Sequence, residues 1–465
     1  MIFKCRLTDD ADLTFSRIPH LYFNGSKTKS LLAEDAVING NLLLQGVSVD
    51  GEVRLIGAQI GGTVNCGGST FSNSAESSDF RGEENRGKAI SADRINVEGG
   101  IFLRNGFKAE GEVMLNGARV GGDLSCRGGS FRNINGSALS AENASVEGNV
   151  FLYDGFSAYG TVDFVRAKIG GSINCRGGTF DRVLLKAVVV RSMFVWSDIQ
   201  NPKSAQVDLR DANVGSVADD KKSWPLRGNL HLDGFEYGRF SGSPSDDTFG
   251  EVAEEESSEI QKRFGGRLVE DSPTDARSRL KWLDRDAVFK PQPYRQLAKV
   301  LQQTGDEEGA KQVLFEMENR VRAQDRRSLI LPNRLLQWMF DKGYKETVGY
   351  GLYPLRAVWE LGILWGLGFV LFRRAKVMAP TDREAYSSFR EKGQLPKHYP
   401  RFSAPIYSLE NCAPLVKFGQ DDHWQPDPNP QPFVSGAVPT TGLWTRFRAR
   451  CLRLWTSPRW LSRAR

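Results

Sequence analysis

The amino-acid sequence predicts a β-solenoid at the N-terminal end, followed by an α-helical hairpin and a membrane-associated helix. The segment GEVMLNGARVGGDLSCRGGSF (111–131) recurs with small changes at 51–71 and at 160–180. Apolar residues within it alternate at period two, which is typical of β-strands, and glycines stand where turns are needed. Helical periodicity appears only later in the chain, and a single long apolar run follows at 352–372.

The spacing of the repeats indicates stacked coils. The two strand pairs inside one unit lie 11 residues apart, and the larger period is 49 residues from Cys126 to Cys175. The period is 60 residues from Cys66 to Cys126, because the polar stretch 74–85 is inserted there. We interpret 49 residues as two coils of about 22 residues plus a short insertion. Each such coil buries its inward face only by stacking on its neighbours.

Three cysteines occupy the same position of the repeat, and we expect them to point inward. Stacked strands are about 4.8 Å apart, so cysteines two coils apart would be separated by roughly 10 Å. A disulfide needs Cα atoms closer than about 7 Å. The chain has six cysteines and no C-x-x-C motif. We therefore interpret Cys66, Cys126 and Cys175 as small apolar residues of a ladder, not as a redox or metal site.

The G-E-V-x-L-x-G-A-x-[IV]-G-G-x-[LVI]-x-C units resemble those of bacterial pentapeptide-repeat-like β-solenoid proteins with a C-terminal membrane segment. Some of these relatives are labelled membrane-associated oxidoreductases. The four histidines here are scattered, and no dinucleotide-binding, P-loop, H-E-x-x-H or G-x-S-x-G motif occurs. The sequence therefore predicts no catalytic residue, no cofactor-binding residue, no cofactor and no metal ligand.

Composition and periodicity divide the chain into segments. The expected order is a β-solenoid domain (1–240), an acidic flexible linker (241–275), a tetratricopeptide-like helical hairpin (276–328), a membrane-associated helical segment (329–376) and a poorly structured basic tail with a degenerate pore-loop-like stretch (377–465). The linker is assigned because 241–259 contains seven carboxylates and no basic residue. An acidic docking segment is the alternative interpretation of these residues.

Residues 293–320 carry two helical stripes with a break at Gly305–Asp306. Tyr294, Leu297 and Ala310 fit the pattern of one tetratricopeptide-type hairpin. A single hairpin cannot form a peptide-binding groove. We therefore expect it to cap the solenoid or to pack on a neighbouring helix at 278–289.

The apolar run at 352–372 has 21 residues, which is just enough to cross a hydrocarbon core. Arg356 and Glu360 interrupt it at a spacing that allows them to pair. The relatives named above carry a similar G-Y-G-x-x-P-x-R-A entry (here 349–357) before a membrane span, so the resemblance favours membrane association. A re-entrant or interfacial helix is the alternative to a full crossing.

Gly362 and Gly366 form a G-x-x-x-G pair, which would permit a homo-oligomer in lipid. Two other stretches resemble parts of ion channels. TVGYG (347–351) matches the potassium-filter pentapeptide but has no membrane helix and pore helix before it. Residues 402–420 resemble the loop of two-helix pore proteins, yet Lys417 inside the loop argues against cation conduction.

Charge and targeting signals suggest where the protein resides. The start of the chain lacks a signal-peptide pattern, and the cysteines show no disulfide framework. We therefore expect a bacterial inner (plasma) membrane protein with its solenoid in the cytoplasm. Residues 440–465 contain seven arginines, three tryptophans and no acidic residue. They represent either a truncated or frame-shifted end or an interfacial segment that binds anionic lipid.

Together these features predict a membrane-anchored solenoid scaffold or protein-binding module. Its expected partners are the lipid bilayer and an unknown protein bound on the solenoid faces, with no nucleic acid. Two alternatives stay open. One is a membrane-associated enzyme with an unrecognised site, and the other is a degenerate pore-loop membrane protein.

Overall fold

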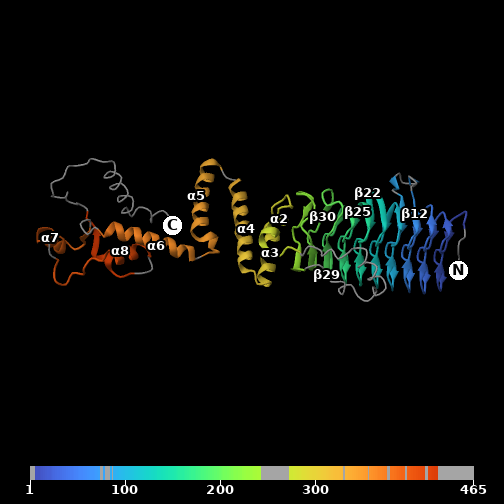
Figure 1. The fold of residues 1–465 in the computed structure, drawn as a ribbon, viewed down its shortest axis with the longest axis horizontal. Helices are drawn as coiled ribbons and strands as arrows, with labels where there is room; N and C mark the ends of the chain where they lie inside the picture. The colour runs from blue at the N-terminus through green and yellow to red at the C-terminus, as the bar shows by residue number, and fades with distance from the viewer. Residues whose placement is uncertain are drawn as a thin grey trace. The chain divides into compact units, whose positions relative to one another are not determined.

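The computed structural model describes residues 6–73, 77–78, 84–85, 87–241, 272–327, 330–353, 355–373, 378–392, 395–413 and 417–427. The chain forms two compact units, Met1–Lys345 and Glu346–Arg465. The first unit contains a β-solenoid of about nine turns (Figure 1). The prediction of a β-solenoid in the N-terminal part of the chain is therefore confirmed.

The solenoid has four faces of short parallel strands, grouped into two sheets. In the first sheet, one face contains β1 (Ala11–Asp12), β5 (Leu31–Leu32), β9 (Val53–Arg54), β15 (Lys88–Ser91), β19 (Glu112–Met114), β22 (Ser130–Ser140), β25 (Ser157–Asp163), β28 (Thr179–Leu184), β30 (Gln206–Asp208) and β32 (Leu230–His231). The adjoining face of the same sheet contains β4 (Lys27–Thr28), β8 (Ser48–Val49), β12 (Thr70–Ser72) and β18 (Lys108–Glu110), and then continues into β22, β25 and β28.

The second sheet supplies the other two faces. One contains β2 (Arg17–Ile18), β6 (Val37–Ile38), β10 (Gln59–Ile60), β16 (Asn96–Val97), β20 (Arg119–Val120), β23 (Ser145–Val146), β26 (Lys168–Ile169), β29 (Val189–Trp196), β31 (Asn213–Asp219) and β33 (Glu236–Phe240). The other contains β3 (Leu21–Tyr22), β7 (Leu42–Leu43), β11 (Val64–Asn65), β17 (Ile101–Phe102), β21 (Leu124–Ser125), β24 (Val150–Phe151) and β27 (Ile173–Asn174), and continues into β29 and β31.

Strand register gives the length of one turn. Leu21 pairs with Leu42, and Leu42 pairs with Val64, so these turns take 21 or 22 residues. The insertion expected inside the 49-residue period lies in β22, where the register shifts between Arg132 and Ser137. The polar insertion at 74–85 contains a small antiparallel pair, β13 (Ser77–Ser78) with β14 (Glu84–Asn85), and its other residues lie outside the described part of the chain.

The repeated glycines stand where a side chain would strain the backbone or clash with a neighbouring turn. Gly117 has a φ of 65°, a left-handed conformation that glycine adopts without strain. The equivalent residue one turn later is Asn143 with a φ of 56°, and asparagine is one of the residues that tolerates this region. At Gly121 the reason is crowding, because an added Cβ would lie 2.2 Å from the backbone oxygen of Glu98.

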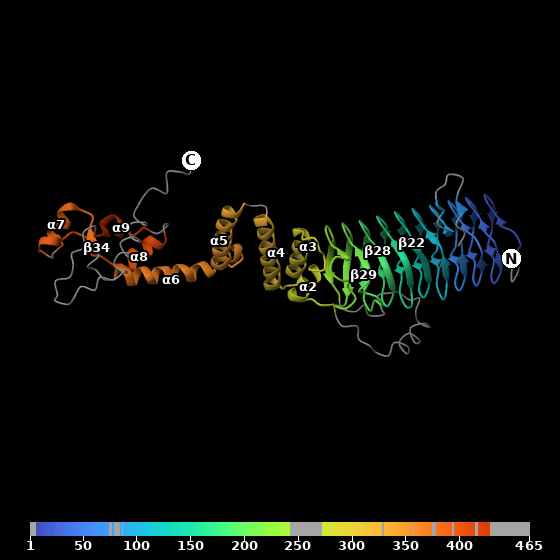
Figure 2. The same ribbon diagram turned by 90° about the horizontal axis from the view of Figure 1, so that it is seen from above.

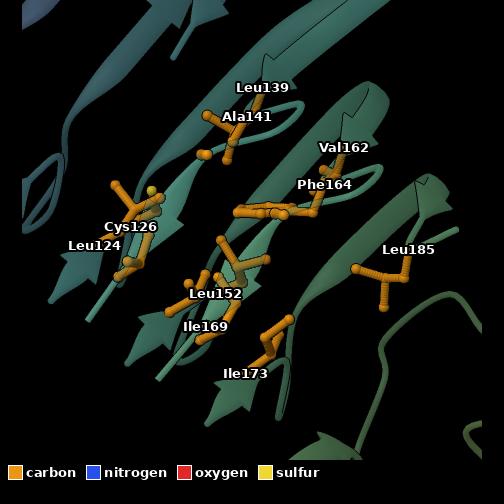
Figure 3. Close-up of a cluster of buried hydrophobic side chains, with 14 of the residues drawn as sticks. Leu124, Cys126, Leu139, Ala141, Leu152, Val162, Phe164, Ile169, Ile173 and Leu185 are labelled. Carbon is orange, nitrogen blue, oxygen red and sulfur yellow. The ribbon is translucent and has the colours of Figure 1, made fainter. Parts of the chain in front are cut away.

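Apolar side chains stack in columns inside the solenoid (Figure 3). One column is aromatic, with successive ring centroids 5.2–5.4 Å apart. Its members are Phe71, Phe107, Phe131, Phe156, Phe180 and Trp196. Such ring pairs add about 0.5–1.5 kcal/mol each to the free energy gained by burial alone. The core is therefore a continuous ladder that no single coil could form.

Helices follow the last strands of the solenoid. They are α2 (Ala276–Leu283), α3 (Pro291–Gln303), α4 (Glu307–Arg327) and α5 (Leu331–Val348). The Asp275 carboxylate caps α2 by accepting the Ser278 N–H at 2.8 Å, and Gly305 at a φ of 88° separates α3 from α4. The expected break at Gly305–Asp306 is present, whereas α2 ends at Leu283 and is shorter than the helix expected at 278–289.

The second unit contains the apolar helix and several short elements. They are η2 (Gly349–Gly351), α6 (Leu355–Phe372), β34 (Met378–Pro380), α7 (Arg383–Lys392), α8 (Ala404–Cys412), α9 (Gln420–His423) and β35 (Trp424–Pro426). The expectation of a poorly structured segment from 377 onward is corrected for 378–427, where β34 pairs with β35 and Met378, Tyr407 and Trp424 form a buried cluster. These apolar residues are isolated in the sequence, so no periodic pattern indicated them.

Two predicted segments cannot be compared with the structure. Residues 242–271, most of the acidic linker, and residues 428–465, which include the arginine-rich end, lie outside the described residues. The last part of the expected linker is nevertheless fixed to the solenoid. The Ser272 hydroxyl accepts the Asp219 N–H at 2.8 Å and lies 3.1 Å from the Asp219 carbonyl oxygen, to which it donates.

Candidate functional site

The three repeat cysteines lie in one inward column, as the sequence predicts. Backbone pairing places Leu103 between Cys66 and Cys126, and Leu152 between Cys126 and Cys175. Figure 3 shows Cys126 and Leu152 among the inward side chains. All three thiols are free and buried. Burial raises the pKa of Cys66 to about 12 and raises the pKa of Cys126 and Cys175 above the ordinary value. A reactive thiol is usually exposed and has a low pKa, so this environment is that of packing residues.

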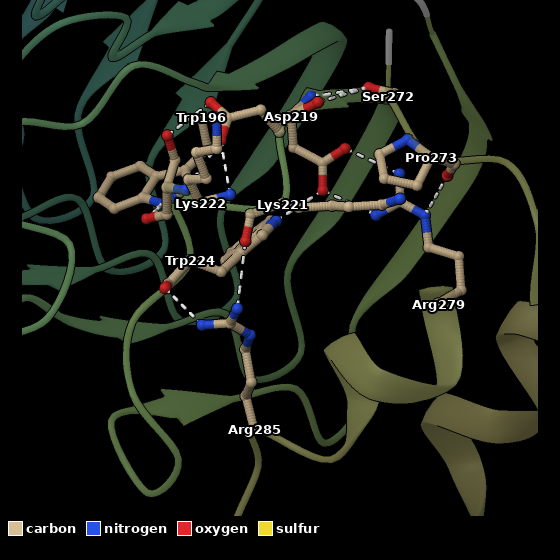
Figure 4. A network of polar contacts seen from close by, with 11 residues as sticks. Trp196, Asp219, Lys221, Lys222, Trp224, Ser272, Pro273, Arg279 and Arg285 are labelled. Carbon is tan, nitrogen blue, oxygen red and sulfur yellow. Dashed lines mark hydrogen bonds and ion pairs between the residues drawn. The ribbon is translucent and has the colours of Figure 1, made fainter. Parts of the chain in front are cut away.

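A buried ion pair joins the last turns of the solenoid to α2 (Figure 4). Arg279 donates from Nη1 and Nη2 to the two carboxylate oxygens of Asp219, at 2.7 Å each. Asp219 also accepts the Trp224 indole N–H at 2.6 Å, while Arg279 Nε donates to the Pro273 carbonyl at 2.6 Å. The guanidinium carbon lies 3.4 Å from the ring centroid of Phe240. Every polar atom of this pair has a partner, so the arrangement is structural.

Side chains of the helical region bind the open backbone edge of the last turn. Gln292 accepts the Gly234 N–H at 2.9 Å and donates to the Phe235 carbonyl at 3.3 Å. Gln296 donates to the Tyr237 carbonyl at 2.6 Å. Unpaired strand edges invite pairing with further strands. These side chains occupy that edge, so this end of the solenoid is closed.

Helix α6 is an exposed apolar element of the second unit. It has 18 residues, none of them buried, and it is the one described helix long and apolar enough to cross a membrane. The Arg356 guanidinium lies over the Tyr353 ring, 4.6 Å from the centroid. Both Arg356 and Glu360 are described, and the ion pair that their spacing would allow is not formed.

The short helix α8 packs beside α6 (Figure 2). A Cβ at Gly368 would lie 2.1 Å from Ser408 Oγ, so glycine is required for this approach. The Ser408 hydroxyl donates to the Trp365 carbonyl at 2.8 Å, and the Trp365 indole donates to the Pro405 carbonyl at 2.9 Å. Sequence reasoning missed Gly368. The only signal was a third glycine in a glycine-rich apolar run, and that signal does not identify a partner.

Gly362 and Gly366, the predicted oligomer contact, are open positions. An added Cβ at either glycine would meet nothing within 4 Å among the described residues. The predicted helix pairing in lipid therefore has free space on α6, and it stays a prediction.

The described residues of the two channel-like stretches adopt other conformations. Within TVGYG, Gly349–Gly351 form a 3₁₀ turn in which Tyr350 has a φ of 59°. In the second stretch, Glu410 accepts the backbone N–H groups of four residues at 2.8–3.2 Å, and these are Phe418, Gly419, Gln420 and Asp421. A potassium filter presents carbonyl oxygens to the ion. Here backbone N–H groups converge on a carboxylate instead.

The described residues contain no group of three or more His, Cys, Asp or Glu side chains placed to hold a metal ion. No protein-family model matches the chain, and no significant match was found to a curated protein or to a solved structure. The features available for a functional argument are thus the solenoid faces and the exposed apolar helices.

Proposed function

We propose that this protein is a membrane-anchored β-solenoid scaffold or protein-binding module. The observation that carries the proposal is α6, an apolar helix of 18 residues without a single buried residue. It lies in the same chain as a β-solenoid whose last turn is covered by side chains of α3. Exposing such a surface to water is costly, since each buried apolar Å² contributes about 25 cal/mol. A hydrocarbon core removes that cost.

The proposed location is a bacterial inner membrane, with the solenoid in the cytoplasm. The proposed family is that of the pentapeptide-repeat-like solenoids, which the repeats of this chain resemble. It also treats α3 and α4 as a tetratricopeptide-like hairpin whose role is to cap the solenoid. The contacts of Gln292 and Gln296 with the last turn support that role.

The binding role is supported by one solenoid face. Phe102 and Phe151 point outward from β17 and β24 and are half-buried, with Ser125 between them in register. An ion pair between neighbouring turns lies beside them, with Arg127 bound to Asp154 at 2.7 Å. Aromatic and arginine side chains are enriched where proteins bind each other. We therefore propose that this face binds a protein partner.

Membrane attachment is tested by extraction and by topology. The protein should stay with membranes at high salt and be released only by detergent. Reporter fusions after Phe240 and after Arg465 then distinguish the two arrangements, because opposite sides mean a crossing and two cytoplasmic reporters mean a re-entrant helix. Release of the whole protein by salt would refute the hydrophobic anchor.

The binding role is tested by a pull-down from detergent-solubilised membranes. The variant Phe102→Ser/Phe151→Ser should lose a partner that the wild-type chain captures. A matched control is Arg119→Ser/Lys168→Ser, which changes exposed outward residues on the neighbouring face. Equal capture by all three proteins would argue against this face.

A further inference from the structure

Helix α5 packs its polar side against α4. The Asp341 carboxylate lies between two arginines of α4, with Arg322 Nη1 at 2.9 Å and Arg326 Nη1 at 2.5 Å. The Arg322 guanidinium also lies 5.2 Å from the ring centroid of Tyr344. Asp341 is the one buried residue of α5. The rotation of α5 about its own axis is therefore set by this clamp.

The opposite side of α5 is apolar and uncovered. The apolar face of α5 consists of Leu331, Leu335, Leu336, Trp338, Met339 and Phe340, whose exposed fractions lie between 47% and 78%. In a helix of a soluble domain, the apolar stripe faces the core and the charged side faces water. Here Asp341, Tyr344 and Lys345 contact α4, and the apolar side chains are exposed.

Position in the chain and charge identify the occupant of this face. Six residues lie between Val348 of α5 and Leu355 of α6, so the two helix ends are at most about 25 Å apart. The exposed side of α5 carries Lys342 and one acidic residue, Glu346. Lys345 faces α4, with its Nζ 5.3 Å from the Phe315 ring centroid, and the charge of Asp341 is compensated by two arginines of α4. Lys342 Nζ lies 5.2 Å from the Trp338 ring centroid. Tryptophan and lysine together are typical of the membrane–water interface.

We propose that α5 lies in the membrane interface, with its apolar face against the acyl chains and Lys342 on anionic lipid headgroups. The proposal rests on the membrane attachment of α6 and adds a second contact with lipid. It also bears on the solenoid. Arg320 of α4 binds Asp284 at 2.6 Å and lies 5.4 Å from the ring centroid of Tyr294 in α3. The clamp thereby holds the capped end of the solenoid at the membrane surface.

The test uses the full chain in lipid nanodiscs with an environment-sensitive fluorophore (NBD) on single cysteines. Cys5, Cys412 and Cys451 are replaced by serine, and the buried thiols stay in place. The fluorophore is attached in three separate variants: Met339→Cys on the apolar face of α5, Ile363→Cys on α6, and Ile134→Cys on β22, a solenoid position that is 63% exposed. Nanodiscs contain phosphatidylcholine with or without phosphatidylglycerol, plus a spin-labelled lipid that quenches fluorophores in contact with acyl chains.

We expect a blue shift and quenching at position 339 in nanodiscs with phosphatidylglycerol, and neither effect at position 134. The quenching at 339 should weaken in neutral nanodiscs and in Lys342→Gln, because Lys342 then lacks an anionic headgroup or is itself missing. Quenching at 339 that is equal in neutral and anionic nanodiscs overturns the selection of anionic lipid.

The remaining outcomes separate this inference from the proposed anchor. A water-like signal at 339 with quenching at 363 overturns the inference and leaves the anchor intact. Water-like signals at both positions overturn the anchor as well. A blue shift at 339 without quenching by the spin-labelled lipid means that protein, such as a second copy of the chain, covers the face, and this also overturns the inference.

Discussion

Arg279 binds Asp219 through two parallel hydrogen bonds of 2.7 Å, and each of the two side chains is only 1% exposed. The two residues are 60 positions apart in the chain, one on α2 and the other at the end of β31. Their pairing attaches α2 to the solenoid. It also places the Arg279 guanidinium on the ring of Phe240 in the final strand.

Replacement of Arg279 by methionine should destabilise the protein strongly. It would leave the Asp219 carboxylate buried without its cation, and breaking a buried pair in this way costs about 3–5 kcal/mol. The free energy of unfolding can be measured by urea denaturation of the detergent-solubilised chain, followed by circular dichroism. Arg277→Met, an exposed position on the same helix, is the control and should change it by less than about 0.5 kcal/mol. Equal effects of the two substitutions would contradict the role of the pair.

Cys126→Asp should prevent formation of a stable solenoid. The thiol is fully buried between Leu103 and Leu152, so a carboxylate there would have no polar partner and its burial would be costly. Cys126→Ala removes only the sulfur and should cost about 1 kcal/mol. The melting temperatures of the two variants test the difference. An unchanged melting temperature for the aspartate variant would mean that position 126 does not face the core.

Stability should fall at alkaline pH because of the buried thiols. Burial raises the pKa of Cys66 from 9.0 to about 12 and shifts the pKa of Cys126 and Cys175 in the same direction. Below pH 9 the thiols are protonated in both the folded and unfolded chains, so their contribution is fully present. Above pH 9 only the unfolded chain ionises, which costs the folded state about 1.4 kcal/mol per thiol for each pH unit until the folded pKa is reached.

The measurement for this prediction compares the melting temperature at pH 8 and at pH 10.5. A variant with all three cysteines changed to alanine should lose less stability over this interval than the wild-type chain. An identical loss in both proteins would assign the alkaline effect to other groups, such as Tyr237, whose pKa is also raised by burial.

Gly368→Val should displace α8 from α6. A Cβ at position 368 would lie 2.1 Å from Ser408 Oγ and 3.2 Å from Ser408 Cβ, so rotating the hydroxyl away does not relieve the clash. Gly366→Val is a matched control, since a Cβ there meets nothing within 4 Å. Limited proteolysis should cut residues 395–413 faster in Gly368→Val than in the control. Equal rates of cleavage would show that α8 does not depend on this contact.

Much of the solenoid follows from local pattern. The period-two apolar pairs and the fixed spacing of Cys66, Cys126 and Cys175 predict inward columns, and the structure confirms that these thiols are buried in one column. The break at Gly305 between two helices is equally local, because it depends on one residue with positive φ. Repetition strengthens such signals, since each coil presents the same inward residues to the next.

Contacts between single residues far apart in the sequence could be identified only from the tertiary structure. Nothing in the local pattern around Asp219 indicates Arg279 as its partner, and Gly368 looks like Gly362 and Gly366 until Ser408 of α8 is placed against it. The local sequence also gives no sign that the Glu410 carboxylate accepts hydrogen bonds from backbone N–H groups 8–11 residues later. The sequence by itself determined the coil, because stacking needs only periodic inward side chains. Only the tertiary structure revealed the attachment of α2 to the solenoid, the α6–α8 contact and the binding of Asp341 by two arginines of α4. Each of these contacts occurs once in the chain, so no repeated sequence pattern predicts it.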